Sequence, residues 1–223
     1  MCTVTFVPTT NGVCITSNRD EKIARPKAIA PASYIINNKE ITFPKDPQAG
    51  GTWIAHDNEN IIVLLNGAQE KHISKGNYRK SRGLIVLDLI SSNNALAKWK
   101  IIDLHEIEPF TIIFYNSEKL VKLQWNEVEK STLELDKSKN YIWSSATLYA
   151  KEIREERAKW FDNFMLQTKK VNSHSLLEFH RFTESENLNY GLQINRNNLL
   201  KTVSITQCVI KETISLNYID LLE

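Results

Sequence analysis

Short apolar runs separated by polar turns dominate the beginning of the chain. Residues 4–7 and 13–16 are two β-like runs, and the turn between them ends in Asn11 and Gly12. An Asn-Gly pair beside alternating residues is a strong signal for a β-hairpin. The pattern therefore predicts that the second run folds back beside the first, which brings residues 18–21 toward the start of the chain.

Further strand-like runs follow, and most of them are separated by short polar turns. We expect paired strands at residues 52–56 and 61–66, three strands at 111–114, 120–125 and 128–135, and a strand that enters a turn at 141–146. Alternation of apolar and polar residues at 121–125 predicts that one face of that strand is exposed to solvent. The last two runs, 203–211 and 213–218, are expected to pair beside the first hairpin.

Helical spacing of apolar residues is confined to three segments. Residues 81–104 predict two helices with Ser92 or Asn93 as the N-cap between them, and residues 149–168 and 174–182 predict two more. The apolar stripe of 149–168 is rich in aromatic residues, which favours packing onto a sheet over a contact with haem or lipid.

The prolines mark the irregular part of the chain, because all six lie at or before Pro109. Residues 24–52 contain four of them together with the Gly50-Gly51 pair. This composition predicts a long surface excursion that is interrupted by a short hairpin at Asn37-Asn38. Long loops in compact domains are often functional, so we interpret this excursion as one wall of a pocket.

Composition and charge narrow the class of protein. The chain has 223 residues, of which 42% are hydrophobic and 24% charged, and no linker interrupts it, so we expect a single domain over residues 1–223. A net charge of +2 without a basic cluster argues against nucleic-acid binding. The longest unbroken apolar run, 61–65, is far shorter than the ~20 residues of a membrane span. The start of the chain has no signal-peptide pattern.

The cysteines and histidines do not have the spacing of a metal site. Cys2, Cys14 and Cys208 are an odd number of widely separated thiols, and the last two lie in strand-like runs where buried, inert thiols are expected. His174 and His180 are six residues apart and do not share a helix face. A reducing cytoplasm fits this cysteine usage best.

The start of the chain carries the candidate chemistry. If Met1 is removed, Cys2 presents a thiol beside a free α-amine, whose pKa of ~8 allows it to exchange protons at neutral pH. The predicted hairpin brings Arg19 toward Cys2, where the guanidinium would lower the thiol pKa, and Asp20 or Glu21 could hold the amine. The alternatives from these residues alone are an inert terminal thiol and a solvated charge cluster.

Several motifs together resemble one known family. They are Met1-Cys2, Asn18-Arg19-Asp20-Glu21, Arg25-Pro26, Asp46 with Gly50-Gly51-Thr52-Trp53, Asn66, and Ser81-Arg82-Gly83, with a weaker match at 141–148. In this order they resemble the NRDE family, also called the transport and Golgi organisation family. The resemblance implies an α+β fold of the N-terminal nucleophile hydrolase type, a four-layer αββα sandwich of two antiparallel sheets between helices.

The resemblance also assigns roles to individual residues. It implies Cys2 as nucleophile, Arg19 with Asp20 or Glu21 beside it, and Asn66 as the donor to an oxyanion. The residues that it implies around the substrate are Gly51, Thr52, Trp53, Ser144 and Ser145. Two positions depart from the family pattern, because relatives commonly have asparagine where Ser145 stands and often have an arginine where only Lys201 is near.

Two classes of function follow from these observations. The first is a hydrolase or acyltransferase that acts on an amide or thioester of a small acyl substrate through processed Cys2, without a cofactor. The second, suggested by the resemblance to eukaryotic members, is a carrier of haem or acyl lipid, with Cys2, His56 or His72 as axial ligands of haem. A purely structural partner protein is a weaker third class, since no heptad or repeat is visible.

Overall fold

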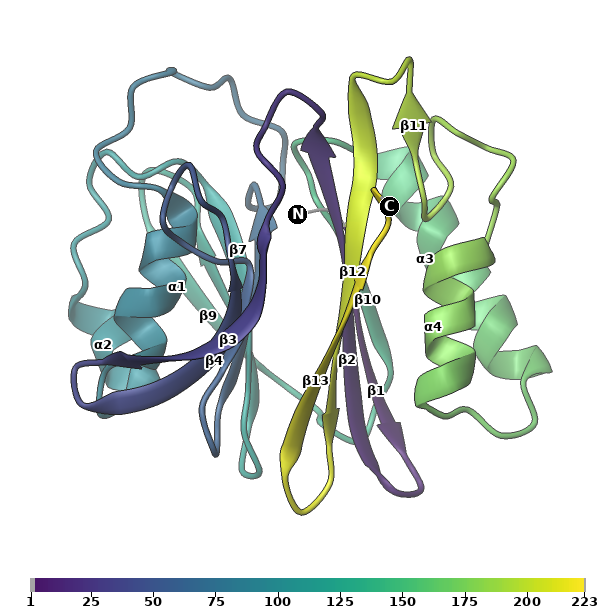
Figure 1. Ribbon diagram of the computed structural model, residues 1–223, viewed down its shortest axis with the longest axis horizontal. Coiled ribbons are helices and arrows are strands. Elements are labelled where there is room, and N and C mark those ends of the chain that lie inside the picture. Colours follow the sequence, from purple (N-terminus) through teal and green to yellow (C-terminus); the bar gives the residue numbers. More distant parts are fainter. Residues whose placement is uncertain (1–2, 223) are drawn as a thin grey trace. The chain divides into compact units, whose positions relative to one another are not determined.

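Each half of the fold is built from one antiparallel sheet and two helices that cover one of its faces. The computed structural model describes residues 3–222. The chain divides into unit 1, made of Met1–Arg25 and Lys137–Glu223, and unit 2, made of Pro26–Asp136 (Figure 1). The predicted α+β class with two antiparallel sheets and flanking helices is confirmed. The single domain over residues 1–223 stays a prediction.

The sheet of unit 1 is centred on the predicted opening hairpin. Its strand order is β10-β1-β2-β12-β11, and β13 also pairs with β12. The strands are β1 Thr3–Thr9, β2 Gly12–Lys22, β10 Tyr141–Ser144, β11 Asn195–Arg196, β12 Leu200–Ile210 and β13 Ile214–Asp220. Gly12 has φ +127° in the hairpin turn, and a Cβ there would lie 1.8 Å from the carbonyl oxygen of Ile210. The hairpin therefore needs glycine at this position. The prediction that the last strands lie beside the hairpin is confirmed, since β12 pairs with β2.

Helices α3 (Lys151–Gln167) and α4 (Ser173–Phe182) cover one face of this sheet. Asn172 caps α4 in a reciprocal capping box with Ser175. Phe161 of α3 and Phe179 of α4 pack with Val7 and Cys14 of the hairpin in one apolar cluster. The aromatic stripe of α3 is therefore core, as predicted.

The sheet of unit 2 is a seven-stranded meander in the order β3-β4-β5-β6-β7-β8-β9. Its strands are β3 Ile29–Ile36, β4 Lys39–Lys45, β5 Ile54–His56, β6 Ile61–Asn66, β7 Phe110–Tyr115, β8 Leu120–Trp125 and β9 Lys130–Leu135. All consecutive strands pair antiparallel. The strands predicted between residues 52 and 135 are confirmed.

The predicted surface excursion at 24–52 is largely wrong, because most of it is the hairpin β3–β4. Asn37 (φ 52°) and Asn38 (φ 62°) form its turn, as the sequence indicated. Pro31 is tolerated because β3 is an edge strand whose register shifts between Ile29 and Ala32. Pro31 therefore marks an edge of the sheet rather than a long loop.

Helices α1 (Arg82–Ile90) and α2 (Ala95–Ile101) cover one face of the seven-stranded sheet. The predicted N-cap of α2 at Ser92 or Asn93 is wrong, because Asn94 accepts the bond from the Ala97 N–H. The Ser92 hydroxyl instead donates to the Leu89 carbonyl at the end of α1. A single polar stretch offers several capping side chains, so the pattern located the break between the helices but not the cap.

The prediction of a solvent-exposed face along residues 121–125 is wrong. Gln124 is buried, and its amide donates to the Thr111 hydroxyl at 3.0 Å, which donates to the Gly67 carbonyl at 2.9 Å. Lys122 is half-buried. Alternation cannot separate an exposed glutamine from a buried one whose hydrogen bonds are satisfied.

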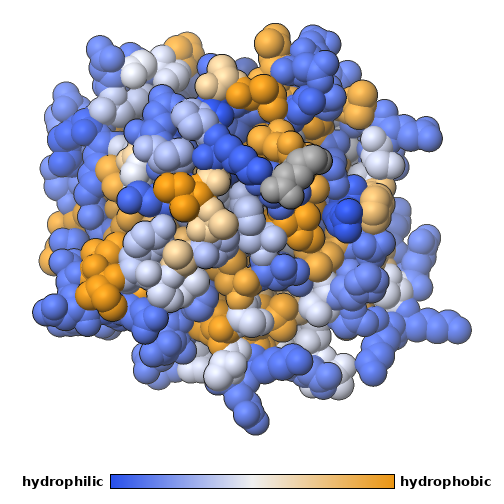
Figure 2. Space-filling model, in the orientation of Figure 1, coloured by the Kyte–Doolittle hydropathy of each residue, from blue (hydrophilic) through white to orange (hydrophobic). Residues whose placement is uncertain are grey.

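Among residues 3–222, no helix combines the length and the apolarity that crossing a bilayer requires. The face drawn in Figure 2 interleaves hydrophobic and hydrophilic residues. Single exposed hydrophobic side chains occur in both units, for example Ile73 and Leu166.

Candidate functional site

The first described residue of β1 is held on both sides by neighbouring strands. Thr3 pairs with Asn18 of β2 and with Ser144 of β10, and its side chain is fully buried. Its hydroxyl oxygen lies 3.4 Å from the Ser144 hydroxyl. Cys2, the predicted nucleophile, lies outside the described residues.

Arg19 and Glu21 lie on the same face of β2. The Arg19 guanidinium is 3.5 Å from a Glu21 carboxylate oxygen, and the Arg25 side chain approaches the same oxygen at 3.6 Å. Arg19 is only 4% exposed, so this ion pair is not a solvated charge cluster. In this position Glu21 compensates the charge of Arg19.

Asp20 lies on the opposite face, because successive side chains of a strand alternate. One carboxylate oxygen accepts a bond from the Tyr149 hydroxyl and the other from the Thr202 hydroxyl, each at 2.6 Å. Asp20 is 3% exposed. The two acids that the sequence left as alternatives thus occupy different environments, Glu21 beside Arg19 and Asp20 beside Tyr149.

Arg157 of α3 joins Asp20 to the start of β1. It is fully buried, and its guanidinium donates to the Thr3 hydroxyl at 2.6 Å and to the Tyr190 carbonyl at 3.0 Å. The guanidinium carbon also lies 3.6 Å from the centre of the Tyr149 ring. We call Thr3, Asp20, Tyr149, Arg157 and Thr202 the Arg157 network.

Sequence reasoning missed the Arg157 network, although one signal was present. Arg157 lies four residues after Ile153 and four before Phe161, in the middle of the apolar stripe of α3. A charged residue at the centre of a buried stripe indicates a buried polar partner.

A second buried group lies beside this network. His180 of α4 is fully buried, with Nδ1 2.5 Å from the Asn18 amide oxygen and Nε2 2.8 Å from the Thr5 hydroxyl. Burial, with a smaller effect of the Arg157 charge, lowers the pKa of His180 to about 3. The neutral ring therefore donates from Nδ1 to Asn18 and accepts at Nε2 from Thr5. Asn18 also donates to the His180 carbonyl at 3.1 Å and to the Leu192 carbonyl at 2.7 Å, so the first residue of the tetrad anchors α4 and the segment after it.

The two described cysteines are unsuited to nucleophilic chemistry, as predicted. Burial raises the pKa of Cys14 to about 11 and the pKa of Cys208 to about 12. Both thiols are free and buried. At neutral pH they are protonated and unreactive.

The candidate substrate residues of β10 and the turn after it are buried to different degrees. Ser144 is half-buried at the end of β10, beside Thr3. Ser145 is 1% exposed, and its hydroxyl lies 2.8 Å from the Thr147 hydroxyl. The serine that stands at position 145 in place of the asparagine common in relatives thus contacts a residue of its own turn, Thr147.

Gly51 and Thr52 form a tight corner of unit 2. A Cβ on Gly51 would lie 2.4 Å from the carbonyl carbon of Gly83, and the Thr52 N–H donates to the Gly83 carbonyl at 3.2 Å. The Thr52 hydroxyl donates to the Pro44 carbonyl at 2.6 Å. The glycines of two separate family motifs therefore pack directly on each other, which requires that neither has a side chain.

Trp53 and Asn66, the other candidates of unit 2, belong to neighbouring segments. Trp53 is 3% exposed, and its carbonyl accepts from the Leu64 N–H at 2.8 Å. Asn66 ends β6, two residues further on, and is half-buried. The structure thus brings Trp53 beside the strand that ends in Asn66.

The histidines suggested as haem ligands lie in polar surroundings. A ring nitrogen of His56 is 2.9 Å from the Asp57 carbonyl oxygen. His72 Nε2 is 3.1 Å from a Glu108 carboxylate oxygen, and the other oxygen of that carboxylate is paired with Arg82 at 2.8 Å. The ring of His56 thus lies beside a backbone carbonyl, and that of His72 beside an ion pair. Among residues 3–222, no group of three or more His, Cys, Asp or Glu is arranged to hold a metal ion.

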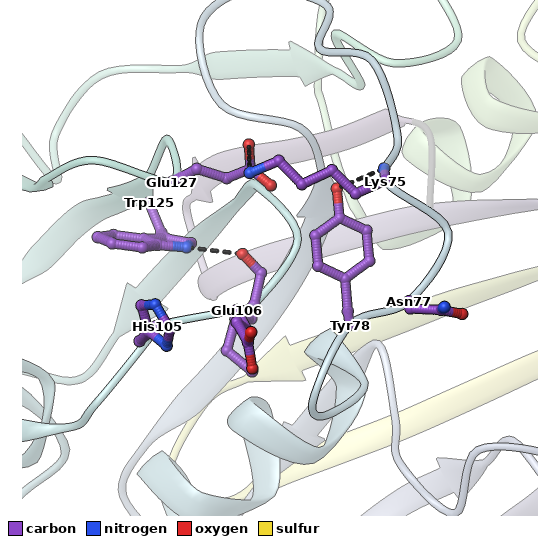
Figure 3. A pocket seen from close by; sticks show the side chains of 8 residues that line it. Lys75, Asn77, Tyr78, His105, Glu106, Trp125 and Glu127 are labelled. Atoms are coloured by element: carbon purple, nitrogen blue, oxygen red, sulfur yellow. Dashed lines mark hydrogen bonds and ion pairs between the residues drawn. The ribbon is translucent and has the colours of Figure 1, made fainter.

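Unit 2 also contains a cavity that none of the predicted site residues lines. Its volume is about 280 Å³, and Figure 3 shows Trp125, Tyr78 and several charged side chains around it. Lys75 is ion-paired with Glu127 at 3.2 Å, and the Trp125 indole donates to the Ile107 carbonyl at 2.8 Å. The charges of both signs at its rim do not select one chemical class of ligand.

Comparison with known proteins identifies the family. No curated protein matches the sequence. A solved structure of Anbu from Hyphomicrobium sp. strain MC1 is similar over 99% of this chain and 88% of that chain, with 9% sequence identity and a TM-score of 0.40, a value too low to support an argument. The family model of Transport and Golgi organisation 2 matches residues 1–212. The chain therefore belongs to the Transport and Golgi organisation 2 family, as the sequence motifs indicated.

Proposed function

We propose that the protein is a hydrolase or acyltransferase that uses processed Cys2 on an amide or thioester of a small acyl substrate. The observation that carries this proposal is the fixed start of β1. Thr3, the residue after Cys2, is fully buried and pairs with Asn18, whose neighbour Arg19 is a buried cation. A thiol on the residue before this strand, in a hairpin whose second strand carries a buried guanidinium, is a candidate for activation.

The reaction follows from these groups. The Cys2 thiolate attacks the acyl carbon, and the bond from this carbon to nitrogen or sulfur breaks. The leaving amine or thiol takes the proton that the α-ammonium group carries. Water, or an acceptor alcohol or amine, then attacks the Cys2 thioester and regenerates the thiol.

The remaining candidate residues have supporting roles in this proposal. Arg19 favours the thiolate, and Glu21 holds the Arg19 side chain in place. Asp20, on the opposite face of β2, accepts a hydrogen bond from Tyr149 and so holds that ring in place. Asn66 donates to the oxyanion. The family resemblance is the reason for including Gly51, Thr52, Trp53, Ser144 and Ser145 in this proposal as residues that contact the acyl substrate.

The test begins with the intact mass of the purified protein, which is expected to show that Met1 is removed. Turnover is then measured with a short-chain acyl p-nitroanilide and an acyl thioester. Cys2→Ala is expected to abolish turnover, and Asn66→Ala to lower it about 100- to 1,000-fold. Cys14→Ala is the matched control and is expected to retain activity, because its thiol is protonated at neutral pH. Retention of Met1 in most copies would rule out the mechanism.

A carrier of haem or acyl lipid is the alternative outcome of the same test. In that case the wild type turns over neither substrate, and a spectroscopic haem titration saturates and responds to substitution of Cys2, His56 or His72.

We also propose that the protein acts in the reducing cytoplasm, which the free thiols of Cys14 and Cys208 support.

A further inference from the structure

Arg157 is an unusual choice for its position. It is fully buried within the helix-covered side of unit 1, and the oxygens to which it donates are the Thr3 hydroxyl and the carbonyls of Tyr190 and Gly191. All three are uncharged. Burying a guanidinium against neutral partners is costly, whereas an apolar residue would extend the stripe of α3 at no such cost.

The contacts of Arg157 tie together two parts of the candidate site. One end of the guanidinium holds Thr3, and its flat face stacks on Tyr149 at 3.6 Å. The Tyr149 hydroxyl donates to Asp20 at 2.6 Å. Arg157 therefore links the residue after Cys2 to an acid of the tetrad through a single aromatic ring.

We propose that Arg157 is a positioning residue for the N-terminal nucleophile. Its bond to the Thr3 hydroxyl fixes that side chain at the start of β1, in the residue that directly follows Cys2. Its buried charge favours the thiolate of Cys2. This inference rests on the proposed function, because it gives Arg157 a purpose only if Cys2 is the nucleophile.

The other charged and titratable groups around Arg157 leave this effect in place. His180 of α4 is neutral down to about pH 3, so it adds no charge at neutral pH. The carboxylate of Asp20 of β2 accepts from the hydroxyls of Tyr149 and Thr202, whereas Arg157 contacts the face of the Tyr149 ring. Arg196 contacts the same ring at 5.2 Å and adds a second positive charge. The surroundings of Thr3 on this face therefore include a fixed cation across the neutral pH range.

The first experiment breaks only the bond to Thr3. Cys2 is labelled with methyl methanethiosulfonate, and the rate is read from the mass of the N-terminal peptide between about pH 5 and 9. Thr3→Val keeps the shape and the β-branched side chain but removes the hydroxyl, and we expect labelling and acylation to slow about 3- to 10-fold, the loss of one hydrogen bond. Thr3→Ser is the matched control, because it keeps the hydroxyl and is expected to retain the wild-type profile.

The second experiment removes the charge. Arg157→Met fills the same space in the apolar stripe without a cation, and we expect the midpoint of the labelling profile to rise by about one pH unit, which slows labelling about 10-fold at pH 7. Arg157→Lys keeps a cation and is expected to restore the midpoint while labelling stays slower, because an ammonium cannot bond all three oxygens. If Arg157→Met does not fold, Thr3→Val and Arg157→Lys still decide the question.

The results separate this inference from the proposed function. A wild-type Cys2 that labels with the midpoint of an ordinary cysteine would overturn the proposed function and this inference with it. An activated wild-type Cys2 whose profile is unchanged in Thr3→Val and Arg157→Lys, while only thermal stability falls, would show that Arg157 is merely structural and would leave the proposed function intact.

Discussion

Unit 1 and unit 2 each combine an antiparallel sheet with two helices, but only unit 1 buries a large group of polar side chains between its sheet and its helices. In unit 2 the layer is apolar, and Ile85, Leu89, Trp99 and Phe110 belong to one continuous cluster. In unit 1 the corresponding layer has an apolar half around Phe161 and a polar half that contains the Arg157 network and His180 with its partners Asn18 and Thr5.

This difference indicates which unit gains less stability from its buried layer. Buried polar groups contribute little net stability even when they are fully hydrogen-bonded, and an apolar layer of the same size would be more stable. The polar half contacts Thr3 and Asn18, a paired couple at the end of the sheet where β1 begins. Under the proposed function, unit 2 contributes the more stable layer, and unit 1 contains the buried polar groups beside the start of the chain.

The largest expected effect is in the apolar layer of unit 2. Phe110 is fully buried and packs edge-on against Trp99 with ring centres 5.9 Å apart. Phe110→Ala is expected to lower the free energy of unfolding by about 3–5 kcal/mol, measured by urea denaturation, because it leaves a large cavity. The labelling rate of Cys2 in the folded variant is expected to stay unchanged. A slowed labelling rate would contradict the division between a stable half and a chemical half.

A smaller effect is expected from acid, and it is confined to unit 1. The pKa of His180 is about 3 in the folded chain, well below its ordinary value of 6.5. Between these values the unfolded chain binds the proton and the folded chain does not, so stability is present above pH 6.5 and falls as the pH is lowered. We expect a loss of about 2 kcal/mol in unfolding free energy from pH 7 to pH 5.

The substitution His180→Gln tests this assignment. It is expected to remove the contribution of His180 to the pH slope, measured by urea denaturation at both pH values. His174→Gln is the control, since His174 is exposed on the same helix and its substitution should leave the slope intact. An unchanged slope in His180→Gln would mean that another group causes the acid sensitivity.

The smallest effect returns to unit 2 and its short helix α2. Asn94→Ala removes the side chain that caps the Ala97 N–H and is expected to lower the unfolding free energy by about 1 kcal/mol in urea denaturation. Asn93→Ala, one residue earlier and exposed, is expected to have almost no effect. Equal effects of the two substitutions would argue that the cap is not fixed at Asn94.

Much of this architecture was predictable from local pattern. The hairpin at Gly12, the paired strands of unit 2 and the helix at 151–167 each follow from alternation or helical spacing within one short window. The edge strand β3 was misread because proline is a signal for both loops and sheet edges. Local pattern does not say whether a neighbouring strand is present.

The polar interior was not predictable, because its partners are far apart in the sequence. Arg157 and Thr3 are separated by 154 positions, and Asn18 and His180 by 162. Likewise, alternation within residues 121–125 predicted Gln124 in solvent. Its hydrogen-bond partner Thr111 lies on a different strand, outside that window. Whether a buried polar side chain is satisfied depends on tertiary contacts that no short window contains.

The register shift in β3 has a further consequence for molecules that meet in solution. A free strand edge can add a strand from another chain, which is a common first step of aggregation. At one edge of the seven-stranded sheet, Pro31 lacks the N–H that such pairing needs, and the irregular register disturbs the hydrogen-bonding row. At the other edge, β9 presents the charged side chains of Lys130 and Glu134. Both borders of this sheet thus discourage strand addition, which protects the chain at high concentration.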